Sequence, residues 1–380
     1  MTKYFFIFFL LLPFLGQTQI VKQNINTDNR MKVGIDSIVQ KSVTLFMSDT
    51  SKVGLSAGVY KNGKIYSYNY GSSLKVKQKL PTNNTIYEIG SISKTFTGTL
   101  LAQAICDKKV AFEDDIRKYM EGSYPNLEYQ RHPITIANLV NHTSGLPYFL
   151  PDKPEILNTQ NYDSLIANIQ NVQRKYSRQD FFKDLHKVRL DTIPGFKNNY
   201  SNSAVQLLGY VLEKIYKMPY KKLVQTYLSI PLKLNNTGLN YSNIKNPNLA
   251  KGYNGKGKQM SYMEPIAGGA GGIHSTVNDM LSYIKYQLNE TDKSVALSHK
   301  ITWGDINDYA IGIFWDENKT PKGYKRILHS GGTYGFSSYC VIYPELNIGI
   351  VLLTNEADQT AQGGLEEIAN KIFENLHNEK

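Results

Sequence analysis

Ser91 and Lys94 are the residues of this sequence whose types and spacing best fit a catalytic pair. They stand three positions apart, directly after Gly90 and at the start of an apolar run that continues to Ile105. On an α-helix this spacing places both side chains on one face, about one turn apart. The Lys94 amine can then take the proton of the Ser91 hydroxyl, which is inert at neutral pH without a neighbouring base. The spacing therefore predicts a serine nucleophile.

The same Ser-x-x-Lys spacing occurs at three other places, where the local sequence argues against a catalytic pair. The first leads into a charged connector, the second lies among Asn, Gly and Pro, and the third falls inside a helical pattern where the serine N–H is already bonded. These are Ser72/Lys75, Ser242/Lys245 and Ser282/Lys285. Only Ser91 follows a glycine and opens a helix, where free N–H groups and the helix dipole favour developing negative charge.

Ser56 is a rival nucleophile, because residues 54–58 spell G-x-S-x-G. That motif works only as a strand, a sharp turn and then a helix. Here Asn62-Gly63 separates two β-prone runs, and this dipeptide is the strongest short-range hairpin signal. We therefore expect Ser56 to lie within a strand.

Tyr200 and Asn202 form a second element, in a Tyr-Ser-Asn triplet between a Pro-Gly turn and an amphipathic helical pattern over 204–212. A phenol in a loop can act as a general base when a nearby cation lowers its pKa. An Asn side chain can both donate to and accept from a substrate amide. Another copy of the triplet, 241–243, lacks the turn and the helix.

His329 and the three residues after it form a third element, at the end of the strand-like run 324–328. The glycines Gly331 and Gly332 let a ligand approach the backbone closely. An oxyanion hole or an edge-on substrate strand requires such an approach. We therefore expect His329, Ser330 and both glycines to lie in a substrate site.

In this order, the three elements resemble the motifs of the serine β-lactamase and DD-peptidase superfamily. The relevant branch holds class C β-lactamases, D-alanyl-D-alanine carboxypeptidases, D-aminopeptidases and related esterases. Supporting matches lie at 134–147, 268–276 and 339–355, and the resemblance spans about 35–375. It implies an α+β, β-lactamase/transpeptidase-like fold, with an antiparallel sheet flanked by helices, a helical insertion lobe, and the active site between the lobes.

The resemblance also implies a role for each residue. Ser91 would be the nucleophile, and Lys94 and Tyr200 would share its proton, with either of them as the base. The other implied groups are Asn202, His329, Ser330 and Gly331 for substrate binding, and the N–H groups of Ser91 and Gly332 for the oxyanion hole. No cofactor is implied, and the seven histidines show no metal-ligand spacing.

The third element departs from the Lys-Thr-Gly of class C β-lactamases. A lysine carries a full charge for a substrate carboxylate, whereas a histidine near its ordinary pKa of about 6.5 carries part of one. This argues against efficient β-lactam hydrolysis. The predicted function is a secreted acyl-enzyme hydrolase of a D-amino-acid peptide, such as a peptidoglycan fragment, or of a related amide or ester. The alternatives are a carboxylesterase, a weak class C-like β-lactamase and a non-catalytic penicillin-binding sensor.

Residues 1–18 have the pattern of a signal peptide: a short positive start, an apolar run from Tyr4 to Leu15, and small residues after it. The run is too short to span a bilayer comfortably. We therefore expect a periplasmic or secreted protein with no transmembrane anchor after cleavage, acting as a monomer.

The formal net charge is +11, but the Lys and Arg residues are dispersed and no nucleic-acid motif is present. The charge therefore indicates a solvated surface rather than a nucleic-acid partner. The two cysteines, Cys106 and Cys340, fall in a helical and a β-rich segment, and we expect two buried free thiols.

The strand-like runs cluster at the two ends of the sequence, which predicts a discontinuous lobe. They lie at 54–61, 64–70, 309–315, 324–328, 337–343 and 348–353, with a final helix over 365–376. The predicted α/β lobe therefore comprises 33–100 and 265–378, and 101–264 form a mainly helical lobe. The Thr-Ser-Gly stretch 143–145 and the glycine-rich run 268–272 are predicted to be tight-packing loops.

Overall fold

The computed structural model of the chain describes residues 25–239 and 246–378. The predicted signal peptide, the Ser242/Lys245 pair and the triplet at 241–243 lie outside the described residues. Within them, no helix is both long and apolar enough to cross a membrane.

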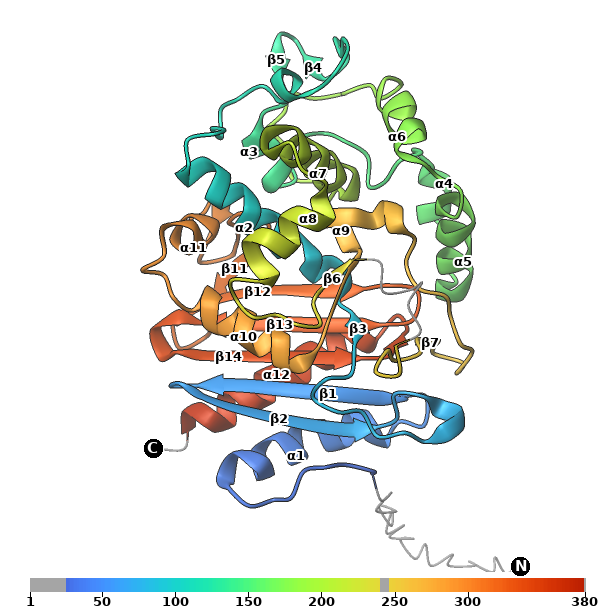
Figure 1. Ribbon diagram of the computed structural model, residues 1–380, viewed down its shortest axis with the longest axis vertical. Coiled ribbons are helices and arrows are strands. Elements are labelled where there is room, and N and C mark those ends of the chain that lie inside the picture. Colours follow the sequence, from blue (N-terminus) through green and yellow to red (C-terminus); the bar gives the residue numbers. More distant parts are fainter. Residues whose placement is uncertain (1–24, 240–245, 379–380) are drawn as a thin grey trace, which may run out of the picture.

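An eight-stranded antiparallel sheet forms the centre of the molecule (Figure 1). Its spatial order is β2-β1-β14-β13-β12-β11-β10-β9, so strands from both ends of the sequence meet at the β1–β14 pair. The strands are β1 (Gly54–Lys61), β2 (Lys64–Gly71), β9 (Trp303–Asp305), β10 (Tyr309–Ile311), β11 (Asp316–Lys319), β12 (Lys325–Gly332), β13 (Ser337–Tyr343) and β14 (Ile348–Thr354). The predicted α+β fold class is confirmed.

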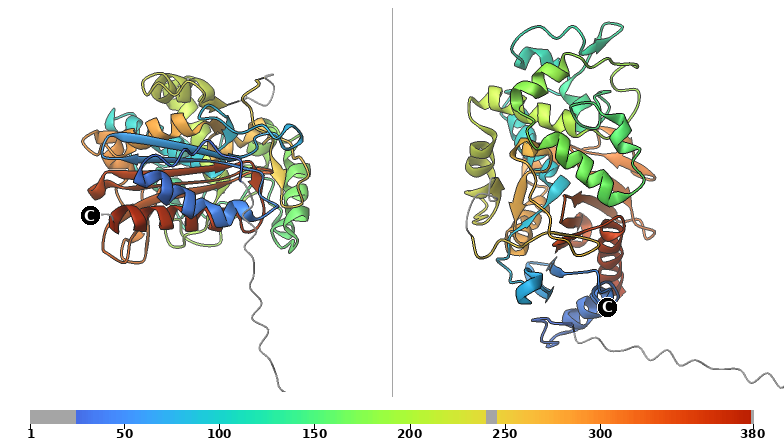
Figure 2. Two further views of the ribbon diagram at one scale, coloured as in Figure 1. Left: turned by 90° about the horizontal axis from the view of Figure 1, so that it is seen from below. Right: turned by 90° about the vertical axis from the view of Figure 1, so that its right-hand side faces the viewer.

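Helices cover both faces of this sheet, which is why β14 is apolar along its whole length. Ile350 and Leu352 pack towards α1 (Gly34–Ser48) and α12 (Ala361–Asn378), which lie side by side in Figure 2. The alternate residues Val351 and Leu353 belong to the core on the other face. There the sheet meets α10 (Val277–Gln287). Successive side chains of a strand point to opposite faces, so a doubly covered strand has no polar side.

The helical part of the chain lies beyond α2 (Ser93–Cys106), away from α1 (Figure 1). Its helices are α3 (Ile136–Val140), α4 (Pro154–Leu157), α5 (Tyr162–Gln173), α6 (Arg178–Leu185), α7 (Asn202–Tyr216), α8 (Tyr220–Val224), α9 (Gly268–Gly271) and α11 (Lys293–Ser298). One hydrophobic core cluster joins Phe96, Leu208 and Ile284. This core contains residues of both expected lobes, the α/β lobe (33–100 and 265–378) and the helical lobe (101–264). The division into two lobes therefore stays a prediction.

Short strands tie the helical part to the rest of the molecule. Glu88 of β3 pairs with His274 of β8, and β8 also pairs with β6. The remaining short strands are β3 (Tyr87–Glu88), β4 (Glu128–Tyr129), β5 (His132–Pro133), β6 (Gly238–Leu239), β7 (Tyr253–Asn254), β8 (Ile273–Ser275) and β15 (Glu356–Ala357).

Two strand predictions were inexact. The run 309–315 is not one strand, because β10 ends at Ile311 and the chain turns through Phe314, whose φ is +60°, before β11 begins. In addition, β12 continues past Leu328 to Gly332, so the third sequence element lies within the strand. This extension places the backbone of His329 to Gly332 along the sheet.

Ser56 lies inside β1, as predicted, so it does not sit in a nucleophile elbow. Its hydroxyl is fully buried and donates to Asn69 Oδ1 at 2.7 Å, with Tyr87 Oη at 2.9 Å. The two other Ser-x-x-Lys serines that the structure describes also form local hydrogen bonds. Ser282 bonds to the Asn278 carbonyl within α10, and Ser72 bonds to the Leu74 carbonyl.

The cysteines are both free, as expected, but they are not both buried. Cys340 is buried in β13, and burial raises the pKa of its thiol to about 12. Cys106 is exposed because it is the last residue of α2, where the helix leaves the core.

Candidate active site

Ser91 lies in a single 3₁₀ turn, Gly90–Ile92, that leads directly into α2. The preceding Gly90 has a φ of +50°, which disfavours any side chain. A Cβ added to Gly90 would also lie 2.7 Å from the backbone nitrogen and oxygen of Gly332. A glycine at this position therefore lets the end of β12 pack closely against the residue before Ser91.

Lys94 faces Ser91 from the first turn of α2. Its Nζ lies 2.8 Å from Ser91 Oγ and donates to the Ala270 carbonyl at 2.6 Å. The side chain is fully buried, and burial holds the pKa of the amine well below its usual value, although nearby Asp316 opposes the shift. Lys94 is therefore suited to accept a proton from Ser91.

Tyr200 reaches Ser91 from the loop before α7. Its hydroxyl donates to Ser91 Oγ at 2.9 Å, and Lys94 Nζ lies 4.9 Å from the centre of its ring. Burial holds the pKa of the phenol well above 10. The sequence argument for a tyrosine base needed a lowered pKa, so the phenol is instead suited to relay a proton as a neutral hydroxyl.

The N-terminus of α7 fixes the position of Tyr200. Ser201 is its N-cap: the hydroxyl accepts from the Ala204 N–H at 3.0 Å and donates to the Pro147 carbonyl at 2.7 Å. The His142 ring packs against the Tyr200 ring in a tilted arrangement, with 4.5 Å between the ring centres. Burial lowers the pKa of His142 to about 3, so it packs there as a neutral ring. No motif marked His142 except its place in the block 134–147.

The residues of β12 supply the other side of the site. A Cβ on Gly331 would lie 2.2 Å from the Ile89 carbonyl, so this glycine is needed for close packing against the chain beside Ser91. His329 Nδ1 lies 2.6 Å from the Ser330 carbonyl. Burial lowers the pKa of His329, with Lys94 adding to the shift and Asp316 opposing it. His329 is therefore mainly neutral at pH 7.

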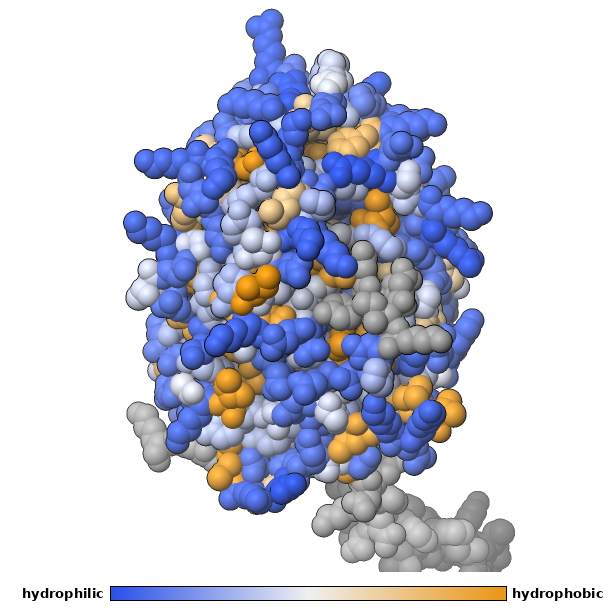
Figure 3. Space-filling view, in the orientation of Figure 1, coloured by the Kyte–Doolittle hydropathy of each residue, from blue (hydrophilic) through white to orange (hydrophobic). Residues whose placement is uncertain are grey.

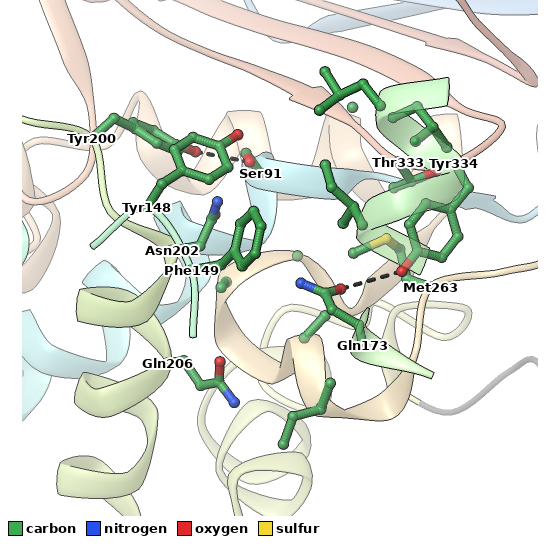
Figure 4. A pocket seen from close by; sticks show the side chains of 18 of the residues that line it. Ser91, Tyr148, Phe149, Gln173, Tyr200, Asn202, Gln206, Met263, Thr333 and Tyr334 are labelled. Atoms are coloured by element: carbon green, nitrogen blue, oxygen red, sulfur yellow. Dashed lines mark hydrogen bonds between the residues drawn. The ribbon is translucent and has the colours of Figure 1, made fainter. Parts of the chain in front are cut away.

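A cavity of about 380 Å³ opens at Ser91 (Figure 4). Six of the predicted residues line it, namely Ser91, Tyr200, Asn202, His329, Ser330 and Gly332. Lys94 and Gly331 are not among the residues that line it. Sequence reasoning missed its other walls: Tyr148 and Phe149 after the 134–147 block, the whole inner side of α5, and Asp316. Of these, α5 alone had a sequence signal, its helical spacing of apolar residues.

The predicted tight-packing loop 268–272 also contributes to the site. Its residues 268–271 form the short helix α9, which places the Ala270 carbonyl against Lys94. The Gly269 carbonyl accepts from the Thr97 hydroxyl at 2.9 Å, one turn further along α2. The glycines thus allow the backbone to approach α2 closely enough to hold the lysine.

Among the residues that the structure describes, no cluster of three or more His, Cys, Asp or Glu could hold a metal ion. The groups around Ser91 are a nucleophilic hydroxyl, a buried amine, a phenol and backbone N–H groups. This set suits acyl transfer to a serine, in which Ser91 attacks a carbonyl carbon and the amine takes the hydroxyl proton.

Comparison with known proteins identifies the family of this chain. Residues 35–371 match the beta-lactamase family. A beta-lactamase from Escherichia coli (strain K12) is 27% identical over 363 residues, covering 85% of this chain and 89% of that protein. Protein flp from Staphylococcus aureus (strain MRSA252) is 29% identical over 315 residues, covering 80% of this chain and 59% of its own length.

The fold has a solved counterpart. The crystal structure of a beta-lactamase/D-alanine carboxypeptidase from Pseudomonas syringae superposes with a TM-score of 0.76 at 22% identity, covering 92% of this chain and all of that one. The chain belongs to the beta-lactamase family, and it is a serine hydrolase of that family.

Proposed function

We propose that this enzyme hydrolyses carboxylic esters and uncharged amides through an acyl-enzyme on Ser91. The observation that carries the proposal is the charge of the cavity beside that serine. Among the described residues that line it, there is no Lys or Arg, His329 is mainly neutral at pH 7, and Asp316 is acidic. Such a lining favours a substrate that has no carboxylate next to the scissile bond.

The reaction proceeds in two balanced halves. Ser91 Oγ bonds to the carbonyl carbon while its proton passes to Lys94 Nζ, and the N–H groups of Ser91 and Gly332 stabilise the oxyanion. The bond to the leaving group then breaks, and that group takes the proton through the Tyr200 hydroxyl. In the second half, water attacks the ester carbon, gives its proton to Lys94 and releases the acid with Ser91 reprotonated.

Cleavage of a D-amino-acid peptide, the first expectation from the sequence, is the second candidate. Asn202 supports it, because its side-chain amide lines the cavity and can pair with a substrate amide. A carboxypeptidase also has to bind the terminal carboxylate. A neutral His329 beside Asp316 offers that carboxylate little attraction, so uncharged amides fit better than free peptide C-termini.

The leader sequence supports a further proposal, that the enzyme acts outside the cytoplasm, in the periplasm or after release. N-terminal sequencing of protein recovered from the cell envelope or the medium tests the location. A start near residue 19 is expected, and an intact Met1 in the cytoplasm contradicts it.

A substrate panel tests the proposed function. We expect turnover of p-nitrophenyl esters and of an N-acetylated D-amino-acid amide to exceed that of a D-Ala-D-Ala peptide and of nitrocefin. A fluorophosphonate should add one label at Ser91, and Ser91→Ala should remove both label and turnover. Ser56→Ala is the matched control and should keep both. Label at Ser56, or a carboxypeptidase activity that exceeds ester hydrolysis, contradicts the proposal.

A further inference from the structure

Helix α5 presents an apolar stripe to the cavity beside Ser91. Leu165, Ile166 and Ile169 recur at helical spacing and line the cavity, with Tyr162 and Gln173 at the two ends of the stripe. No residue of α5 is fully buried. An amphipathic helix normally covers its apolar face against the core. In α5 that face is left to the cavity.

Polar contacts near its two ends hold α5 across the site. Lys256 Nζ lies 2.7 Å from Asp163 Oδ2 in the first turn. In the last turn, the Tyr334 hydroxyl donates to Gln173 Oε1 at 3.2 Å (Figure 4). The helix is thereby fixed as a wall between the loop at 256 and the end of β12. On the face of the protein seen in Figure 3, apolar side chains are interspersed among polar ones.

The position of this wall relative to Tyr200 indicates which part of a substrate it meets. In Figure 4, Tyr200 and Asn202 lie to the left of Ser91, whereas Gln173 and Met263 lie to its right. The leaving group takes its proton from Tyr200, so it departs on the first side. The acyl group of the substrate then extends in the opposite direction, towards α5.

We propose that α5 forms the binding wall for an apolar acyl chain, so that the preferred substrates are derivatives of medium-length or aryl carboxylic acids. This inference rests on the proposed function and names its substrate class. A cavity of about 380 Å³ is within the range of small-molecule pockets. Each methylene buried against such a wall raises kcat/KM by about fourfold.

Two ester series test the inference. In the first, p-nitrophenyl esters run from acetate to decanoate, and kcat/KM should rise at least tenfold before it levels off. In the second, acetate esters of alcohols of increasing length should show little gain. The double variant Ile166→Asn/Ile169→Asn should remove most of the rise in the first series. Asn171→Ala, on the exposed side of α5, is the matched control and should leave the chain-length profile unchanged.

The outcomes separate the two proposals. Ester hydrolysis that depends on Ser91 but does not vary with acyl length overturns the inference and leaves the proposed function standing. A gain that follows the alcohol instead overturns the assignment to the acyl group. No ester hydrolysis and no label at Ser91 overturns the proposed function itself. If the double variant fails to fold, Ile169→Trp decides, because filling the cavity should move the optimum to shorter chains, and an unchanged optimum overturns the inference.

Discussion

Burial divides the proton-transfer work between the two residues that contact Ser91. Burial favours the neutral form of each, so the site stabilises a free amine at Lys94 and an intact phenol at Tyr200. Only the free amine has a lone pair ready to accept a proton. The sequence could bring both residues to Ser91 through their motifs, but it could not choose the base, because that choice depends on desolvation in the folded protein.

The pH profile of ester hydrolysis should reflect this division. Because Lys94 must be deprotonated, kcat/KM should rise with pH through a pKa well below 10.5 and then stay level. No fall is expected between pH 6 and 8, since the pKa of His329 is lowered and its charge is not used. Lys94→Met and Tyr200→Phe should each lower turnover by orders of magnitude, and the double variant should be little worse than either.

Steady-state rates on one neutral ester provide the measurement. A loss of activity as pH rises from 6 to 8 would show that a protonated His329 takes part. Multiplicative losses in the double variant would show that Lys94 and Tyr200 act in separate steps.

Elements with a clear local sequence signal were predicted well. Elements whose role depends on packing against a distant part of the chain were not. Strands β13 and β14 fall where their largely apolar runs place them, and β1 falls where the Asn62-Gly63 turn places it. The role of α9 could not be predicted in the same way. Its glycines signal close packing, but the lysine that they help to hold is 176 residues away.

Packing of α9 against α2 should therefore be sensitive to one added methyl group. A Cβ on Gly269 would lie 2.6 Å from Thr97 Oγ1 and 2.9 Å from the Tyr220 ring. We expect Gly269→Ala to lower the free energy of unfolding by about 1–3 kcal/mol and to reduce turnover, since the Ala270 carbonyl shifts away from Lys94.

The matched control is Gly363→Ala in α12, where an added Cβ meets no atom within 4 Å. A helical alanine there should raise the free energy of unfolding by about 0.5–1 kcal/mol and leave turnover unchanged. Urea unfolding and ester hydrolysis of both variants provide the measurement. Equal stability of the two variants would contradict the role given to α9.

At the scale of the whole molecule, segments that are far apart in the sequence pack against each other, and the site lies where they meet. The Ser338 hydroxyl of β13 donates to the Ile89 carbonyl, two residues before Ser91, across 249 positions of sequence. Motif order indicated that such parts would converge, but not which other residues would come with them. Glu88 is one of these: it lies in β3, beside His274 of β8, and accepts from the Met263 N–H at 2.5 Å.

Glu88 makes the free energy of unfolding of the protein depend on pH. The side chain is 1% exposed, and burial raises the pKa of its carboxyl from 4.5 to about 7. The folded protein therefore binds a proton that the unfolded chain has released between those values. The stabilisation from Glu88 is fully present below about pH 4.5 and is lost as the pH rises through about 7.

Glu88→Gln keeps the size and the hydrogen-bond acceptor but has no proton to lose. Relative to the natural protein, its free energy of unfolding should rise between pH 5 and pH 8 by on the order of 3 kcal/mol, at about 1.4 kcal/mol per pKa unit. The pKa of the neighbouring His274, lowered to about 4, affects both proteins alike and cancels in the difference. Urea unfolding of the two proteins at both pH values provides the measurement. A difference that stays constant with pH would show that Glu88 is ionised in the folded protein throughout this range.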